Sequence, residues 1–400
     1  MTLVDEGRSG QRGGATGAGS RAFRPDVEGL RAVAIGLVLL FQAGVPSFGA
    51  GLIGVDVFFV ISGFLITGLL VREAERTGRV SLRDFYARRA RRILPSAAFV
   101  LLVTLVGSVL LLPERTSAIA RDVVAAGAQV ANWWMLSFDV HALDPVAEHS
   151  PVKHYWSLAV EEQFYVVWPL LVLLVARRAR REPGALRRRL AVALGVLSAV
   201  SLVASVVITS QAGLFGYLST ITRAWQFGVG GLLALATPWL AARCREGRAA
   251  SRLRAAGWAG ALVLGLSAGL ATRFPYPGAV ALVPTLAAAA VIAAGTAGVA
   301  RGSVAQVLSW PLVRTCGRLS YVWYLWHVPA VVLAVQVLGA RHWAVLLAVE
   351  LLAVVPAALT ARFVERPLRF SPLVAASPRR GLLLGAVTTA VVVGSGLALA

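Results

Sequence analysis

Four arginines crowd one short segment of the chain and could together bind phosphate groups. They are Arg88, Arg89, Arg91 and Arg92, and Pro95 opens a long apolar stretch soon after them. Arginine carries a planar guanidinium that pairs two-pronged with phosphate or carboxylate oxygens. Arginines beside a membrane span also hold that end of the span in the cytoplasm. The residue types alone therefore leave two interpretations open, a phosphate site and a topology signal.

Another arginine, Arg31, lies inside an apolar stretch, and Gln42 follows it eleven residues later. Eleven residues of helix return to within about 20° of the starting face and climb about 16 Å, so both side chains would share one stripe near opposite leaflets. Ionisable groups inside membrane spans are costly and are candidates for function. The structural alternative is that Arg31 reaches the headgroups while Gln42 hydrogen-bonds a neighbouring helix.

Two adjacent carboxylates, Glu161 and Glu162, enter a further apolar stretch. Neighbouring residues on a helix point about 100° apart, so we expect at most one of them to face a given cavity. Ser157 and Tyr165 each lie four residues from Glu161 and share its face. A carboxylate in a cavity of low dielectric constant can act as a general base. Alternatively, one glutamate forms an ion pair with Arg223 and the other faces water.

Asp56 lies near the predicted outer end of a different apolar stretch. There it could pair with a cation or with a ligand that bears hydroxyl groups, although an aspartate at the membrane interface is also tolerated structurally. Ser62 and Gly63 follow in the same stretch, and their small side chains allow close packing of helices.

A last polar stripe comes late in the chain. Tyr321, Tyr324 and His327 are spaced three residues apart, so they share one helix face, and Arg318 precedes them at the predicted cytoplasmic mouth. We expect His327 in the inner half of its span. A lone buried histidine is more often a hydrogen-bonded structural residue than a catalyst, but the arginine and tyrosines favour a polar cavity here.

The elements that must position these residues are membrane spans. Of the 400 residues, 58% are hydrophobic and only 14% are charged, whereas soluble domains carry about 25% charged residues. Stretches of about 20 apolar residues predict an all-α polytopic bundle of about ten or eleven transmembrane helices embedded in the lipid bilayer. The predicted spans are 28–46, 52–71, 95–112, 158–176, 190–209, 217–237, 255–272, 279–299, 319–339, 343–361 and 381–400.

The distribution of basic residues predicts a cytoplasmic N-terminus. With this orientation, 32 of the 39 Lys and Arg residues fall in cytoplasmic segments and five in outer segments. The stretch 118–138 carries charged residues, and a span there would reverse every later loop, so we expect an interfacial or re-entrant helix. The net charge of +20 arises from loops beside spans, so no nucleic-acid partner is expected. Cys244 and Cys316 lie far apart in the sequence, so we expect no disulfide and no metal site.

Five segments together resemble the acyltransferase-3 family of bacterial integral-membrane acyltransferases. They occur in the order of the family and comprise 23–31, 54–64, 85–95, 154–165 and 320–329. The resemblance implies an inner-membrane enzyme with no bound cofactor. It would move an acyl group, commonly acetyl, from cytoplasmic acyl-CoA as donor substrate to a hydroxyl of a cell-surface glycan or a lipid-linked saccharide.

The resemblance also assigns roles to particular residues. The Arg-x-x-Arg motif of the family, which contacts the CoA donor, is matched by Arg88 with Arg91 and by Arg89 with Arg92. The Arg-x10-His motif of the family maps to Arg31 and position 42, where this chain has glutamine. A glutamine amide neither accepts a proton near neutral pH nor forms an acyl intermediate.

Gln42 leaves three outcomes open. Either Glu161, His154 or His327 is the base instead, or transfer is slow and rests on positioning, or catalysis is lost. The candidate catalytic residues are accordingly Arg31, Gln42, Glu161 and His154. A transporter or a non-catalytic membrane partner in polysaccharide assembly is the alternative function, because polar stripes in spans also suit transport.

The sequence divides into three predicted parts. Residues 1–22 are rich in small residues and lack an apolar core, which is typical of a disordered cytoplasmic tail. Residues 23–370 form the transmembrane domain that resembles the family. Residues 371–400 form a linker and a final span, a layout that in some members of the family leads to an extracytoplasmic domain.

Overall fold

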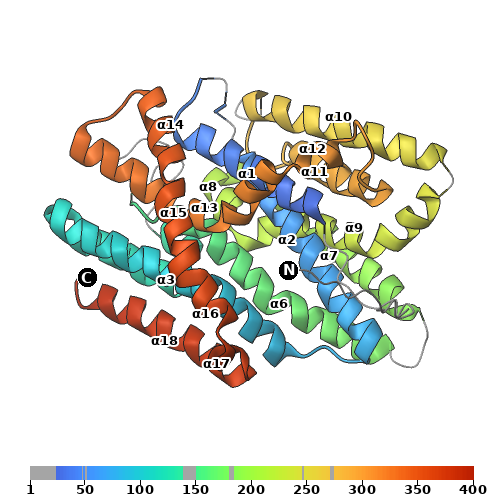
Figure 1. Ribbon diagram of the computed structural model, residues 1–400, viewed down its shortest axis with the longest axis horizontal. Helices are drawn as coiled ribbons and strands as arrows, with labels where there is room; N and C mark the ends of the chain where they lie inside the picture. The colour runs from blue at the N-terminus through green and yellow to red at the C-terminus, as the bar shows by residue number, and fades with distance from the viewer. Residues whose placement is uncertain are drawn as a thin grey trace, which may run out of the picture.

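In the computed structural model, the described part of the chain folds into helices joined by short turns, with no strand (Figure 1). The structure describes residues 24–46, 48–49, 52–137, 150–179, 184–245, 247–270 and 274–400. Eight helices within these residues are long and apolar enough to cross a membrane. The predicted class, an all-α multi-pass membrane protein, is therefore confirmed. The predicted tail 1–22 lies outside the described residues.

Every predicted span coincides with a helix. The helices are α1 (Pro25–Gln42), α2 (Ile53–Thr77), α3 (Leu82–Leu111), α6 (Tyr155–Ala179), α7 (Ala185–Gln211), α9 (Thr220–Cys244), α10 (Arg248–Leu270), α11 (Leu282–Ala294), α13 (Pro311–Leu338), α14 (Trp343–Leu352) with α15 (Val354–Thr360), and α18 (Pro378–Leu397). Three of them, α1, α10 and α11, are not among the eight that meet the length and composition of a span. Helix α11 has only 13 residues, and α1 carries Asp26, Glu28 and Arg31.

The stretch 118–138 forms two short helices rather than one span. They are α4 (Thr116–Gly127), which follows the turn η1 (Pro113–Arg115), and α5 (Ala131–Leu136). Gln129 between them has a left-handed backbone with φ of 59°, which breaks the helix. The Asp122 carboxylate accepts a hydrogen bond from Trp134 Nε1 at 2.8 Å, and burial raises the pKa of this carboxyl group. Both short helices are thus fixed to each other.

The centre of the bundle is held by close approach of helix backbones. A Cβ atom added to Gly63 of α2 would lie 1.9 Å from the carbonyl oxygen of Phe227 in α9. A Cβ atom added to Gly317 of α13 would lie 1.8 Å from the carbonyl oxygen of Glu28 in α1. Only glycine permits such contacts, so the predicted role of Gly63 in close packing is confirmed.

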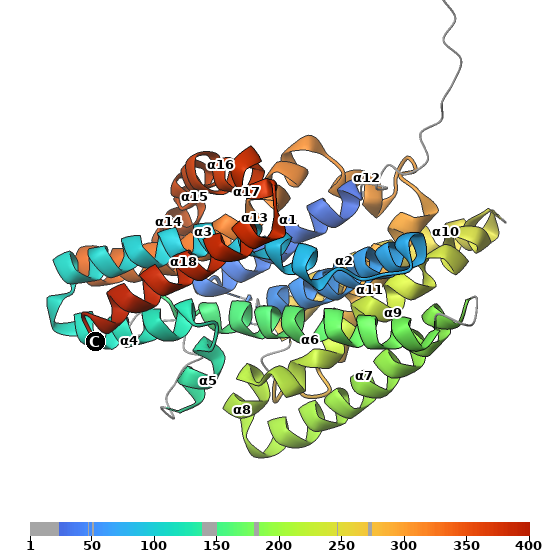
Figure 2. The ribbon, with the colours of Figure 1, turned by 90° about the horizontal axis from the view of Figure 1, so that it is seen from below.

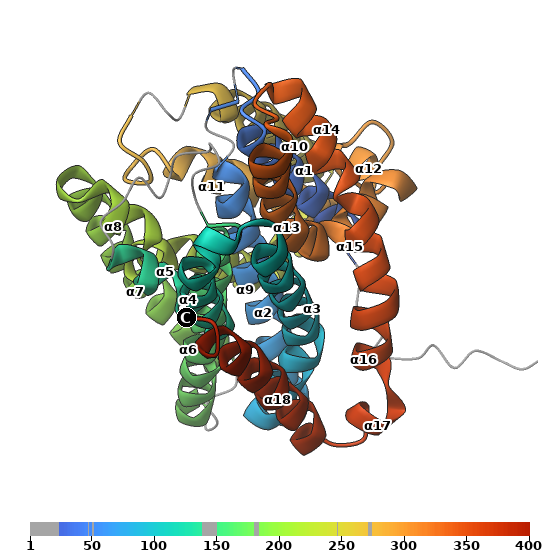
Figure 3. The ribbon, with the colours of Figure 1, turned by 90° about the vertical axis from the view of Figure 1, so that its left-hand side faces the viewer.

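The C-terminal helices wrap one side of this centre. After α15 the chain passes through a π-helical turn η4 (Ala361–Glu365), α16 (Arg366–Phe370) and α17 (Pro372–Ala375). The elements α15, η4 and α16 run beside α13 and α3 (Figure 3). Helix α18 then turns back and lies along α3 and α4 (Figure 2). Three small elements complete the described bundle, α8 (Gly213–Leu218), η3 (Gly295–Ala297) and α12 (Val304–Leu308).

Candidate active site

Three adjoining cavities lie in the bundle between α1, α2, α3, α6 and α13. We call them the vestibule (about 690 Å³), the central cavity (about 80 Å³) and the histidine pocket (about 50 Å³). Arg31, Leu65 and Arg92 line both the vestibule and the central cavity. Val55 and Tyr324 line both the central cavity and the histidine pocket. The three spaces therefore adjoin one another in that order.

Seven arginines and two glutamates line the vestibule. The arginines are Arg24, Arg31, Arg72, Arg92, Arg318, Arg366 and Arg369, and the glutamates are Glu28 and Glu365. Both carboxylates are already engaged, Glu28 with Arg314 at 3.2 Å and with Arg318 at 3.8 Å, and Glu365 with Arg369 at 2.9 Å. Arg24 is in turn paired with Asp26 at 2.6 Å. Arg31, Arg92 and Arg366 form no ion pair with a described residue, and this surplus of positive charge makes the vestibule suited to a ligand with several phosphate groups.

The four arginines predicted to bind the donor do not form one site. Arg92 lines the vestibule and the central cavity, and Arg89 lines the central cavity. Arg88 instead pairs with Glu73 at 3.5 Å, and Nε of Arg91 is buried without a hydrogen-bond partner in the described part of the chain. Residues three apart share a helix face, and the face of α3 that lines the cavities carries Arg89 and Arg92. This pair is one of the two matches to the Arg-x-x-Arg motif, and Arg88 of the other match points away from the cavities.

The sequence assigned no site role to four arginines of the vestibule. Arg24 directly precedes α1, Arg72 lies in the last part of α2, and Arg366 and Arg369 lie on α16. The last three had been explained only as topology signals. Arg366 and Arg369 are three residues apart and share one helix face. This spacing was the available signal for a basic surface in the last predicted loop.

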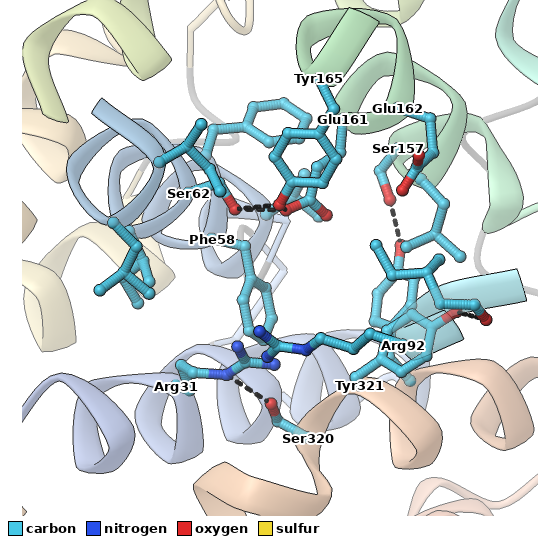
Figure 4. A pocket seen from close by; sticks show the side chains of 18 of the residues that line it. Arg31, Phe58, Ser62, Arg92, Ser157, Glu161, Glu162, Tyr165, Ser320 and Tyr321 are labelled. Carbon is cyan, nitrogen blue, oxygen red and sulfur yellow. Dashed lines mark hydrogen bonds between the residues drawn. The ribbon is translucent and has the colours of Figure 1, made fainter. Parts of the chain in front are cut away.

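Arg31 lies at the junction of the vestibule and the central cavity (Figure 4). Its Nε donates a hydrogen bond to Ser320 Oγ at 3.1 Å. Its guanidinium carbon lies 5.9 Å from the ring centroid of Phe58, and Figure 4 shows Arg92 beside it. Arg31 forms no ion pair with the residues that the structure describes, so its positive charge is available to a ligand.

Glu161 is held on the opposite wall of the central cavity. Ser62 Oγ and Tyr165 Oη both donate hydrogen bonds to Oε1 of Glu161 (Figure 4). The predicted shared face of Glu161 and Tyr165 is therefore confirmed. The guanidinium carbon of Arg89 lies 4.6 Å from the ring centroid of Tyr165, which fixes the tyrosine from its other side.

Glu162 also lines the central cavity, so the prediction that at most one of the two glutamates faces it is wrong. The reason is that a groove of about 560 Å³ between α3, α6 and α18 adjoins the central cavity at α6, and Arg89, Glu162 and Tyr165 line both. Glu162 makes no hydrogen bond or ion pair with any described residue. The alternative that a glutamate pairs with Arg223 is likewise wrong, because Arg223 pairs with Asp56.

Asp56 does not line any of the three cavities, so of the two interpretations that the sequence left open the structural one applies. Its Oδ1 lies 3.0 Å from Nη1 of Arg223, and both side chains are 0% exposed. Tyr276 donates a hydrogen bond to its other oxygen, and Nε of Arg223 donates to the carbonyl oxygen of Tyr217 at 2.9 Å. This network joins α2 to α9, although Nη2 of Arg223 is buried there without a hydrogen-bond partner among the described residues.

The polar residues on one face of α13, predicted from their spacing, are divided between the three cavities. Arg318 lines the vestibule, as predicted for a mouth residue, while Tyr321 and Tyr324 line the central cavity. His327 lies farther along, in the histidine pocket with Gln42. Its expected place in the inner half of the membrane span stays a prediction.

The histidine pocket brings together residues that are distant in sequence. Gln42 ends α1, His154 directly precedes α6, and His327 lies in the middle of α13. Tyr324 closes the side toward the central cavity, where its hydroxyl and Ser157 Oγ share a hydrogen bond of 2.7 Å. Both histidines are buried, with 5% and 1% of their surface exposed.

A family described as an acyltransferase domain matches residues 24–363 of this chain. The peptidoglycan O-acetyltransferase OatA of Listeria monocytogenes is 31% identical over 357 residues, which are 88% of this chain and 56% of the relative. The putative peptidoglycan O-acetyltransferase YrhL of Bacillus subtilis is 32% identical over 361 residues, or 87% and 55%.

The O-acetyltransferase OatA of Staphylococcus aureus is 31% identical over 358 residues, or 88% of this chain and 58% of the relative. The chain thus spans little more than half the length of these curated relatives. No solved structure is significantly similar to it.

Proposed function

Because the chain belongs to the acyltransferase-3 family, we propose that it transfers an acetyl group from cytoplasmic acetyl-CoA to a hydroxyl of a cell-envelope glycan. The curated relatives carry the name O-acetyltransferase, and two of them are named for peptidoglycan. The observation that carries the proposal is the arginine-lined vestibule that leads into a narrow polar cavity.

The shape of the donor matches the order of these two spaces. CoA carries its phosphate groups at one end and its thioester at the end of a slender arm. The wide vestibule would hold the phosphates through arginine forks, and the narrow central cavity would admit only the arm and the acyl group. The acyl carbonyl would then lie near Arg31, whose unpaired guanidinium can stabilise the negative oxygen of a tetrahedral intermediate.

The distribution of Lys and Arg supports the orientation of this reaction in the plasma membrane. The basic residues gather at the end of the bundle that holds the vestibule, so the vestibule would face the cytoplasm, where acyl-CoA is found. The histidine pocket would then lie toward the outer side. An acceptor glycan, soluble or lipid-linked, would approach from there, and the two substrates would meet near Tyr324.

A second candidate function is a transporter or a non-catalytic membrane partner in polysaccharide assembly. Gln42 favours it, because this residue lines the histidine pocket at the position where the family motif has histidine. A protein of this second kind would bind the donor or a saccharide without cleaving the thioester.

The discriminating experiment uses the purified chain in lipid nanodiscs with acetyl-CoA labelled in the acetyl group. We expect CoA release that depends on soluble peptidoglycan fragments, together with label recovered as an ester on those fragments. Binding of acetyl-CoA without release of CoA or transfer of label would contradict the enzyme and support the second candidate. Arg31→Gln is the inactive control, since it removes the unpaired charge at the cavity junction.

A further inference from the structure

The glutamine at position 42 leaves open which group accepts the proton of the acceptor hydroxyl, and two buried imidazoles share its pocket. We propose that His327 is this proton acceptor, through its Nε2 atom, and that His154 positions it. The inference rests on the proposed acyl transfer and names the catalytic base of that same site.

Hydrogen bonding assigns the tautomer of His327. Its Nδ1 is hydrogen-bonded to the carbonyl oxygen of Tyr324. A carbonyl oxygen only accepts hydrogen bonds, so Nδ1 carries the ring proton. In the neutral ring, Nε2 then has a free lone pair, and it makes no hydrogen bond to any described residue. The side chain that lines the pocket thus offers a bare basic nitrogen.

His154 is fixed by a hydrogen bond to a backbone carbonyl oxygen that receives no helical hydrogen bond, because a proline stands four residues later. Its Nε2 lies 3.2 Å from the carbonyl oxygen of Leu325. Pro329 lies four residues after Leu325 inside α13 and has no N–H to donate to that oxygen. The oxygen therefore accepts from His154, and Nδ1 of His154 is left buried without a partner.

The two rings are in direct contact. Their centroids lie 4.9 Å apart with an interplanar angle of 73°, an edge-to-face arrangement. His154 thereby holds the plane of the His327 ring. Among the described residues that line the pocket there is no carboxylate, and Lys153 is a positively charged residue. The imidazoles are therefore the groups in the pocket that can accept a proton.

Glu161 is less suited to this task. Its Oε1 already accepts two hydrogen bonds, from Ser62 and from Tyr165. It lines the central cavity and not the histidine pocket, which lies on the other side of Tyr324. A donor thioester that enters from the vestibule and an acceptor that enters from the opposite end would meet at the wall formed by Tyr324, within reach of His327.

The step is balanced without a further reactant. The proton of the acceptor hydroxyl passes to Nε2 of His327 while the hydroxyl oxygen bonds to the thioester carbon. The C–S bond then breaks, CoA leaves as a thiolate, and the proton held by His327 is released to give CoA thiol and the ester. Gln42 takes no part in the proton transfer and can hydrogen-bond the acceptor.

The test separates the base from the structural role of the ring. In His327→Asn the side-chain amide can still donate to the carbonyl oxygen of Tyr324, but Nε2 is gone. We expect kcat for acetyl transfer to soluble peptidoglycan fragments to fall by about 100-fold or more, with an unchanged Kd for acetyl-CoA. His154→Gln, which keeps a donor toward Leu325, should lose about tenfold, as expected for a positioning residue. His342→Asn, at the exposed start of α14, should not change kcat.

A second variant tests whether the loss of kcat is due to the missing base. Gln42→His in the His327→Asn background should recover at least about tenfold of kcat, because it returns an imidazole base to the same pocket. If His327→Asn fails to bind acetyl-CoA, His327→Gln replaces it with the same expectation. A kcat within about threefold of wild type, or a loss that Gln42→His does not recover, overturns the inference. A wild-type protein that transfers no acetyl group overturns the proposed function instead.

Discussion

The arginines of the vestibule and the Asp56–Arg223 ion pair are charges in the same membrane domain, but they differ in what neutralises them. Asp56 and Arg223 neutralise each other at 3.0 Å, with no exposed surface. Seven arginines and two glutamates line the vestibule, and Arg24, Arg318 and Arg369 have carboxylate partners, whereas Arg31, Arg92 and Arg366 form no ion pair with a described residue. A membrane charge that is matched by another side chain holds helices together, whereas a surplus of one sign indicates a ligand of the other sign.

The largest effect should follow from breaking the matched pair. Asp56→Asn leaves Arg223 buried without a counter-charge, and we expect a loss of about 3–5 kcal/mol in the free energy of unfolding. Denaturant unfolding in detergent measures it. The control is Glu75→Gln, which breaks the exposed pair with Arg187 and should cost less than about 1 kcal/mol. Equal effects of the two changes would remove the distinction between matched and surplus charge.

The next largest effect concerns catalysis. Arg31→Gln removes the unpaired charge between the vestibule and the central cavity, and we expect kcat for acetyl transfer to fall by about 10²–10³-fold. Ser320→Ala deletes only the acceptor of the Arg31 Nε hydrogen bond and should cost less than tenfold, a loss of about 1 kcal/mol. Steady-state assays in nanodiscs compare the two, and an unchanged kcat for Arg31→Gln would place the reaction elsewhere.

A smaller effect is expected at the rim of the vestibule. The double variant Arg366→Gln/Arg369→Gln removes two positive charges from its wall and leaves the Glu365 carboxylate without its partner Arg369. We expect the Kd for acetyl-CoA to rise about tenfold, equivalent to about 1.4 kcal/mol. Calorimetry at low salt measures the change, which should shrink at high salt because screening weakens exposed charges. A Kd that stays at the wild-type value would exclude α16 from donor binding.

The smallest effect is expected at an arginine that sequence reasoning had placed in the donor site. Arg88 is 39% exposed at its side chain and pairs with Glu73, so Arg88→Gln should change the Kd for acetyl-CoA by less than about twofold. The matched change is Arg92→Gln in the same helix, which should raise Kd by clearly more. The reverse order would mean that the other register of the Arg-x-x-Arg motif binds the donor.

The difference between the paired and the unpaired charges also explains which features could be predicted from the sequence. Apolar stretches predicted every long helix, because burial in lipid depends on composition alone. Spacing within one helix predicted the shared face of Glu161 and Tyr165. Neither kind of pattern reports which helices are neighbours, so neither foresaw that Arg223 meets Asp56.

The same limit applies to the candidate site. Gln42, His154 and His327 line one pocket because three helices meet there, and no pattern within a single helix could predict this. The arginines of α16 were missed because a basic residue after a span has a sufficient explanation in topology. A surplus of charge becomes visible only when the residues around a common space are counted together.

The most direct test of the central claim compares acetyl-CoA with S-acetylpantetheine, which has the thioester and the slender arm but not the nucleotide and its phosphates. If surplus arginines bind the phosphates, wild-type protein at low salt should bind acetyl-CoA at least about 100-fold more tightly, and Arg366→Gln/Arg369→Gln should narrow the difference. Equal affinities for the two thioesters would contradict the account, because the vestibule would then contribute nothing to recognition of the donor.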